Sequence, residues 1–182
     1  MTYYDDIYEC AVDNYYLIST KDASRLGIPT VELAKLAHRG KLKHVSHGLY
    51  RLARYVPHEY DPYAISVASV GEDAYLFGES VIAMLRLAPT NPAHMYVATP
   101  HRHRKKTLSD GLTVIERPRA NDMTVYEGIP SQRVGEAIVS CIGKMMDERL
   151  NLAADNARAE GYLVAREYER VKEAIANHEA AQ

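Results

Sequence analysis

The most regular alternation of hydrophobic and polar positions lies in the N-terminal third of the chain. Ser19 and Asp22 suit the start of a helix, since the serine hydroxyl can accept from the open N–H groups and the carboxylate favours the positive helix end. Ala23 and Leu26 supply an apolar face to this helix. Gly27 then permits a tight turn.

A second helix is predicted to begin at Pro29 or Thr30 and to run through Arg39, where Gly40 ends it. At about 100° per residue its residues separate into two faces. The apolar face consists of Leu33, Ala34, Leu36 and Ala37, and the polar face of Glu32, Lys35, His38 and Arg39.

A short hairpin is expected next, with strands over 42–45 and 49–52 joined by a turn at 46–48. Two helices followed by such a hairpin are typical of a winged helix-turn-helix. Residues 20–56 hold eight Lys and Arg against two Asp and Glu. This excess of cations favours DNA as the binding partner, with the second helix in the major groove and the basic wing on phosphates. The candidate DNA-binding residues are Thr30, Lys35, His38, Arg39, Lys41, Lys43, His44 and His47. A structural winged helix that binds protein is the alternative.

The remaining punctuation predicts an α+β chain in three parts. A helix over 5–14 is expected to pack on the winged helix-turn-helix, which would occupy residues 1–56, and the Pro-containing stretch 54–63 is interpreted as a linker. A small mixed α/β domain over 64–146 and a helical tail over 147–182 would follow. In the second domain we expect helices over 63–70, 80–87 and 131–146, and strands over 95–98, 112–115 and 124–125.

The tail is rich in Ala, Glu and Arg, and Gly161 is expected to break it into two helices. It would either pack on the second domain or dock a protein partner or a second copy of the chain. A basic run over 101–106 lies between two expected strands. It is interpreted as a solvated loop or as a second phosphate-contacting or acid-binding patch, with the cations Arg102, Arg104, Lys105 and Lys106.

Composition narrows the function classes. The formal net charge is −2, so any affinity for DNA must come from local clustering of cations. Two cysteines far apart, no N-terminal apolar segment and no apolar run of membrane length suggest a cytoplasmic protein that spans no membrane. Motifs for phosphate loops, nucleophile elbows and zinc sites are missing from the sequence, so we expect no catalytic activity, no cofactor and no metal site.

Two groups of sequence blocks carry a family resemblance. The run "TKDASRLGI", the end "LAHRGKL" of the second helix and the wing "HVSHGLYRL" resemble the N-terminal domain of the AbiEi antitoxins of type IV toxin–antitoxin systems. Downstream, "YLFGESVIAMLRL", "MYVAT" and "LTVIERP" followed by "VYEGIPSQRVGEAI" resemble the C-terminal domain of that family. Together these stretches cover most of residues 15–142, whereas the last forty residues match no part of the family.

The resemblance implies a repressor that binds double-stranded operator DNA in its own operon. It also implies that the protein opposes a nucleotidyltransferase-like toxin, without requiring a direct complex. Two alternatives stay open, a stand-alone winged-helix transcriptional regulator and a protein-binding scaffold without DNA binding. Operators with inverted half-sites can be bound by two monomers or by a homodimer, so the sequence allows either state.

Overall fold

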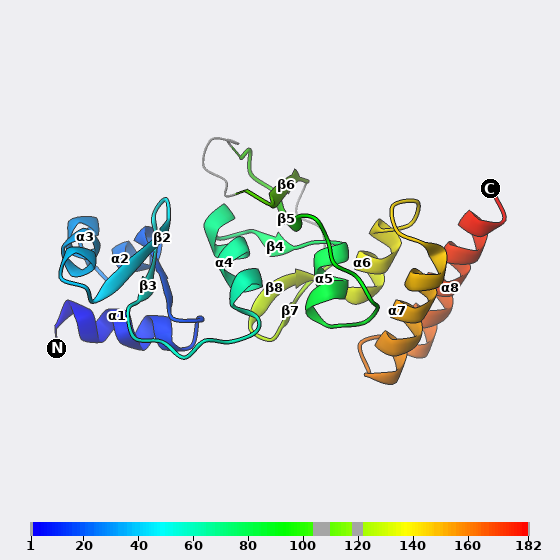
Figure 1. Cartoon of the computed structure of the whole chain (residues 1–182), viewed down its shortest axis with the longest axis horizontal. Helices are drawn as coiled ribbons and strands as arrows, with labels where there is room; N and C mark the ends of the chain where they lie inside the picture. Colours follow the sequence, from blue (N-terminus) through cyan, green and yellow to red (C-terminus); the bar gives the residue numbers. More distant parts are fainter. Residues whose placement is uncertain (1, 104–109, 118–121, 182) are drawn as a thin grey trace. The chain divides into compact units, whose positions relative to one another are not determined.

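Both helices and strands are present in the structure, which is a computed structural model and describes residues 2–103, 110–117 and 122–181 (Figure 1). The chain is therefore α+β, as predicted. Its contacts divide it into two compact units, with the boundary between Glu72 and Asp73. The finer division into a winged helix-turn-helix domain, an α/β domain and a tail stays a prediction.

The first unit contains four helices and one antiparallel sheet among its described residues. In chain order these are α1 (Tyr3–Val12), β1 (Leu17–Ser19), α2 (Thr20–Arg25), α3 (Thr30–His38), β2 (Leu42–Ser46), β3 (Leu49–Leu52) and α4 (Asp61–Val70). The sheet order is β1-β3-β2, so β3 is the central strand. The helix predicted over 5–14 corresponds to α1, whereas the three-residue strand β1 was not predicted because it is too short to show an alternation.

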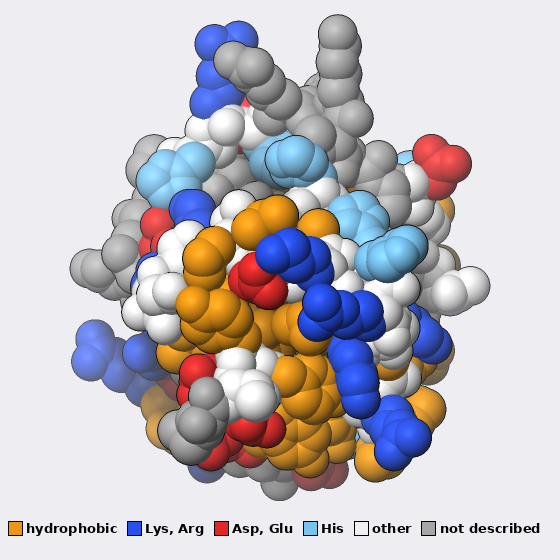
Figure 2. Space-filling view, turned by 90° about the vertical axis from the view of Figure 1, so that its left-hand side faces the viewer, with side chains coloured by type: hydrophobic (Ala, Val, Ile, Leu, Met, Phe, Trp, Pro, Cys, Tyr) orange, Lys and Arg blue, Asp and Glu red, His pale blue; other side chains and the backbone are white. Residues whose placement is uncertain are grey.

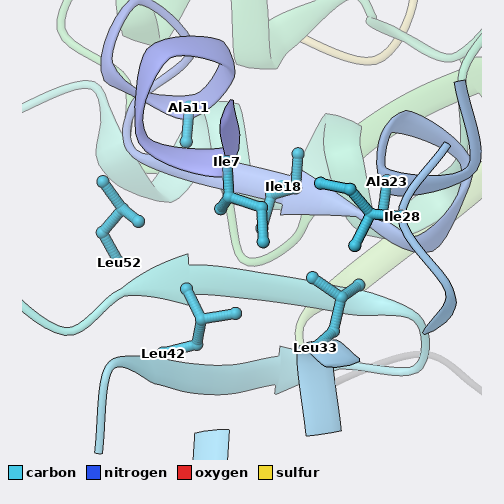
Figure 3. Packing of buried hydrophobic residues seen from close by; sticks show 8 residues of the cluster. All are labelled: Ile7, Ala11, Ile18, Ala23, Ile28, Leu33, Leu42 and Leu52. Atoms are coloured by element: carbon cyan, nitrogen blue, oxygen red, sulfur yellow. The ribbon is translucent and has the colours of Figure 1, made fainter. Parts of the chain in front are cut away.

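Eight buried apolar residues from α1, α2, the turn after α2, α3 and the sheet form the core of this unit (Figure 3). They are Ile7, Ala11, Ile18, Ala23, Ile28, Leu33, Leu42 and Leu52. The prediction that Leu26 belongs to the apolar face of α2 is wrong, since its side chain is 43% exposed. Helix α2 ends at Arg25, and Ile28 enters the core instead after the turn at Gly27.

The opposite face of the sheet is covered by the segment that was interpreted as a linker. Arg51 on β3 is buried, with the Tyr55 ring centroid 3.6 Å from its guanidinium carbon. The Arg51 Nη2 atom lies 2.6 Å from Oδ2 of Asp61, the first residue of α4. On the same helix, Ser69 accepts a 3.0 Å hydrogen bond from the Ser46 hydroxyl of β2. Tyr55 and Asp61 therefore anchor the segment 54–63 to the sheet, and this segment is not a free linker. Helix α4 begins two residues before the predicted position.

The second unit contains a five-stranded mixed sheet of order β6-β5-β4-β8-β7. Its elements up to the last strand are β4 (Tyr75–Leu76), α5 (Glu79–Met84), β5 (Met95–Thr99), β6 (Leu112–Glu116), β7 (Met123–Tyr126) and β8 (Ile129–Gln132). The strands predicted over 95–98, 112–115 and 124–125 correspond to β5, β6 and β7. The strands β4 and β8 were not predicted, and α5 is shorter than the helix expected over 80–87.

The helix predicted over 131–146 is wrong at both ends. Ser131 and Gln132 belong to β8 and are buried. The Gln132 side chain accepts a hydrogen bond from the Gly78 N–H and donates one to the Asp122 carboxylate, so it ties β8 to the segment after β4. Only α6 (Val134–Ser140) is helical before the chain turns at Gly143, whose φ is +76°.

The last part of the chain forms a helical hairpin of α7 (Asp147–Ala159) and α8 (Ala165–Glu179), with Gly161 between them as predicted (Figure 1). Both helices contact α6, and the Asn156 amide donates a 2.8 Å hydrogen bond to the Leu87 carbonyl. The expectation that the tail packs on the preceding α/β elements is confirmed. A further role of the hairpin in binding a partner stays a prediction.

Removing the Asp61 carboxylate should destabilise the first unit strongly. In Asp61→Ala the buried Arg51 guanidinium keeps its charge but loses its partner, which typically costs about 3–5 kcal/mol. Urea denaturation followed by circular dichroism measures the change. Glu32→Ala is the matched control, since it breaks an exposed ion pair with Lys35 and should cost under about 1 kcal/mol. Equal losses in the two variants would contradict a structural role for the buried pair.

Candidate nucleic-acid interface

Helix α2 is fixed at its start by the predicted capping interaction. The Ser19 hydroxyl accepts from the Asp22 N–H at 3.1 Å, and the Asp22 carboxylate accepts from the Ser19 N–H at 3.0 Å. These reciprocal bonds satisfy two backbone donors at the helix N-terminus. Because Ser19 also ends β1, the capping bonds connect the sheet directly to the helix-turn-helix.

Helix α3 is held by its inner face. Leu33 is fully buried, and Leu36 and Ala37 pack against the same core. The helix runs from Thr30 to His38, and Arg39 is its C-cap residue. The predicted second helix is thus confirmed to within one residue at each end.

The outward face of α3 is a mixed apolar and basic strip. At about 100° per residue, four exposed residues fall within about 100° of arc, namely Val31, Ala34, Lys35 and His38. The prediction that Ala34 lies on the apolar inner face is wrong, since its side chain is exposed and points about 100° away from that of Leu33 around the helix axis. Val31, 54% exposed, was not identified as a site residue from the sequence. Its only sequence signal is a β-branched residue outside the helical repeat of the core positions.

The eight cations of residues 20–56 are divided between ion pairs and open surface. Lys21 and Arg25 on α2 both pair with Glu72, Lys35 pairs with Glu32 at 2.7 Å, and Arg51 pairs with Asp61. Among the described residues, no ion pair involves the other four, which are Arg39, Lys41, Lys43 and Arg54. Figure 2 shows Lys and Arg side chains in a line beside hydrophobic side chains on this end of the molecule. Arg54 was not among the DNA-binding residues predicted from the sequence, and the sequence does not show which cations form ion pairs.

The wing is the hairpin of β2 and β3, and its turn is tied to α2. The Thr20 N–H donates a 2.9 Å hydrogen bond to the carbonyl of Gly48, which lies at the turn with a φ of +69°. His47, next to it, is exposed. This hydrogen bond connects the wing tip to the start of α2.

Lys43 and His44 lie on opposite faces of the wing sheet, because successive strand residues alternate. His44 is opposite Tyr50, with their ring centroids 5.3 Å apart, on the face that packs on the core. Lys43 is opposite Arg51 and lies over the Tyr55 ring on the other face. The predicted wing residues therefore do not form one cluster. His44 lies on the core-facing side of the wing sheet, Lys43 lies on the side of Tyr55, and His47 is exposed at the turn.

The second basic patch remains a prediction. Arg102 is exposed in the second unit, next to His101, whose Nε2 atom lies 2.8 Å from the Asp73 carboxylate. Arg104, Lys105 and Lys106 lie outside the described residues. Of the four predicted cations of this patch, Arg102 is thus shown to be on the surface, next to a histidine that is paired with Asp73.

Metal-binding groups, membrane-spanning helices and reactive thiols are the other features to consider in the described part of the chain. No group of three or more His, Cys, Asp or Glu side chains is placed there to hold a metal ion, and no helix of that part is long and apolar enough to cross a membrane. Burial raises the pKa of the Cys141 thiol to about 12, and burial followed by the Asp22 charge raises the pKa of Cys10. Neither thiol is thus activated as a nucleophile at neutral pH.

The segment that contains the elements of this interface matches a known sequence family. Residues 5–53 match the AbiEi antitoxin family of transcriptional regulators. The AbiEi match includes α2, α3 and the whole wing, and therefore all eight candidate DNA-binding residues of the first unit. Among curated proteins, no relative matches the chain. A similar solved structure is the crystal structure of the RV2827C protein from Mycobacterium tuberculosis, 14% identical over 96% of this chain and 82% of that chain, with a TM-score of 0.45.

The tie between the wing tip and α2 predicts unequal effects of two glycine substitutions. Gly27 and Gly48 both have φ near +70°, where any other residue costs about 1–2 kcal/mol. A Cβ at Gly27 meets open space, whereas a Cβ at Gly48 lies 3.1 Å from Thr20 Oγ1. Gly48→Ala should therefore lower the free energy of unfolding more than Gly27→Ala does, as measured by urea denaturation. In a Thr20→Ala background the two losses should become equal, and equal losses without that change would refute the contact.

Proposed function

We propose that the first unit binds double-stranded operator DNA, with α3 in the major groove and the turn at His47 and Gly48 beside it. The observation that carries this proposal is the solvent-exposed strip of α3, continued by Arg39 and Lys41, which have no carboxylate partner among the described residues. A helix presented in this way by a helix-turn-helix is suited to groove docking. Unpaired cations at its end can neutralise phosphates without first breaking an ion pair.

The individual residues have different expected roles. Thr30, Lys35, His38 and Arg39 are the candidates for contacts from α3, and Lys41, His44 and His47 for contacts nearby. Lys35 must exchange Glu32 for DNA, so its contribution to affinity should be smaller than that of Arg39. Lys43, on the opposite sheet face, would contact DNA only if the duplex also meets that side of the wing.

The family match supports a repressor that acts as an antitoxin. In this proposal the protein represses its own operon and opposes a nucleotidyltransferase-like toxin encoded beside it. The part of the chain after Glu72 would provide the opposition, and no residue is assigned to toxin contact, because type IV opposition does not require a complex.

Operator binding is tested by a mobility-shift titration against the DNA upstream of the gene, with unrelated DNA as competitor and at two salt concentrations. Arg39→Ala should weaken specific binding by about 1–3 kcal/mol if Arg39 contacts a base, and Lys41→Ala should lower the salt slope by about one if Lys41 contacts a phosphate. Lys172→Ala is the control, since Lys172 pairs with Asp155 in the second unit. Binding that ignores sequence, or no binding, would favour the protein-binding scaffold.

Antitoxin activity is tested by growth rescue. Induction of the neighbouring nucleotidyltransferase-like gene should arrest growth, and expression of this protein from an unrelated promoter should restore it. Arg39→Ala should restore growth equally, because the unrelated promoter removes the need for operator binding. Specific DNA binding without rescue would instead indicate a stand-alone regulator.

A further inference from the structure

The N-terminal half of α3 presents two apolar side chains to solvent. Val31 and Ala34 are the second and fifth residues of the helix, both are exposed, and neither belongs to the core of the first unit. We propose that these two side chains read the C5 methyl groups of thymines in the major groove of the operator. This inference rests on the proposed function and specifies which bases α3 recognises.

The chemistry of the major groove supports this assignment. Each base pair presents a different set of donors and acceptors there, and thymine alone among the four bases adds a methyl group. Alanine and other methyl-bearing side chains are suited to contact that group. Residues near the N-terminus of a recognition helix are the ones that reach base edges. Val31 and Ala34 occupy such positions, and exposed Thr30 adds a further methyl beside them.

The polar neighbour on this part of the helix is already engaged. The Lys35 ammonium lies 2.7 Å from the Glu32 carboxylate, so its donors are partly occupied before DNA binds. Arg39, which has no carboxylate partner among the residues that the structure describes, lies at the opposite end of the helix. Apolar contacts therefore dominate recognition at the first turns of α3, whereas hydrogen bonds and phosphate contacts dominate near His38 and Arg39. The operator should consequently contain one or more thymines at fixed positions in each half-site.

Substitution of deoxyuridine for thymine tests the proposal, because deoxyuridine lacks only the C5 methyl group. Each thymine of the bound upstream sequence is replaced singly, and affinities are measured by mobility shift. At one or two positions the wild-type protein should lose affinity by about threefold or more, the amount expected for one buried methyl. Val31→Ala should bind the unmodified DNA more weakly and should lose most of its sensitivity to deoxyuridine at one of these positions.

Val125→Ala is the matched control, since Val125 is 60% exposed, comparable to Val31, but lies on β7 in the second unit. It should keep the complete wild-type deoxyuridine profile. Specific binding that depends on Arg39 but ignores deoxyuridine at every thymine would overturn this inference alone. So would a profile that Val31→Ala leaves unchanged. Absence of any sequence-specific binding would overturn the proposed function and this inference together.

Discussion

Burial of Leu33 against the small core of the first unit is the constraint on which the interface depends. A fully buried leucine contributes about 1.5–3 kcal/mol, and in a helix of nine residues no other residue is fully buried. Burial of Leu33, with Leu36 and Ala37 beside it, determines the rotation of α3 about its own axis. That rotation places Val31, Ala34, Lys35 and His38 in solvent. The composition of the outward strip is therefore a consequence of how the inner face packs.

Four of the eight cations of residues 20–56 form ion pairs within the first unit. Arg51 is enclosed by Tyr55 and Asp61, so its charge stabilises the attachment of α4 to the sheet. The cations of α2, Lys21 and Arg25, form exposed ion pairs with Glu72. Surface pairs such as Lys35 with Glu32 contribute little to folding and exchange easily. A count of basic residues overstates the interface, because only four of the eight cations of residues 20–56 lack a carboxylate partner in the described part of the chain, and two of these, Lys41 and Lys43, lie over tyrosine rings.

Local patterns predicted the helix-turn-helix and wing well because each boundary has its own chemical signal. Ser19 with Asp22 caps α2, Gly27 and Gly40 adopt positive φ, and the apolar repeat of α3 includes the buried Leu33. The errors occur where contacts outside the local repeat determine the structure. Tyr55 and Asp61 were interpreted as linker residues because nothing in the local sequence pattern indicates that they enclose the Arg51 side chain. Ser131 and Gln132 were predicted in a helix because their pairing with β4 and β7 is invisible in local periodicity. Similarly, Ala34 suits either face of a helix, and only the three-dimensional packing decides.

Three backbone hydrogen bonds explain why α3 and the wing can act as one surface. The Lys41 N–H donates to the Leu36 carbonyl and the Ala53 N–H donates to the Lys41 carbonyl, so the exit from α3 is tied to the base of the hairpin. At the other end, the Thr20 N–H donates to the Gly48 carbonyl. The hairpin is thus attached to the helix-turn-helix at its base and at its tip. A surface fixed in this way loses little conformational freedom on binding, so in the proposed complex the weak contacts of a few methyl groups and of Arg39 and Lys41 can be expressed as affinity instead of being offset by ordering.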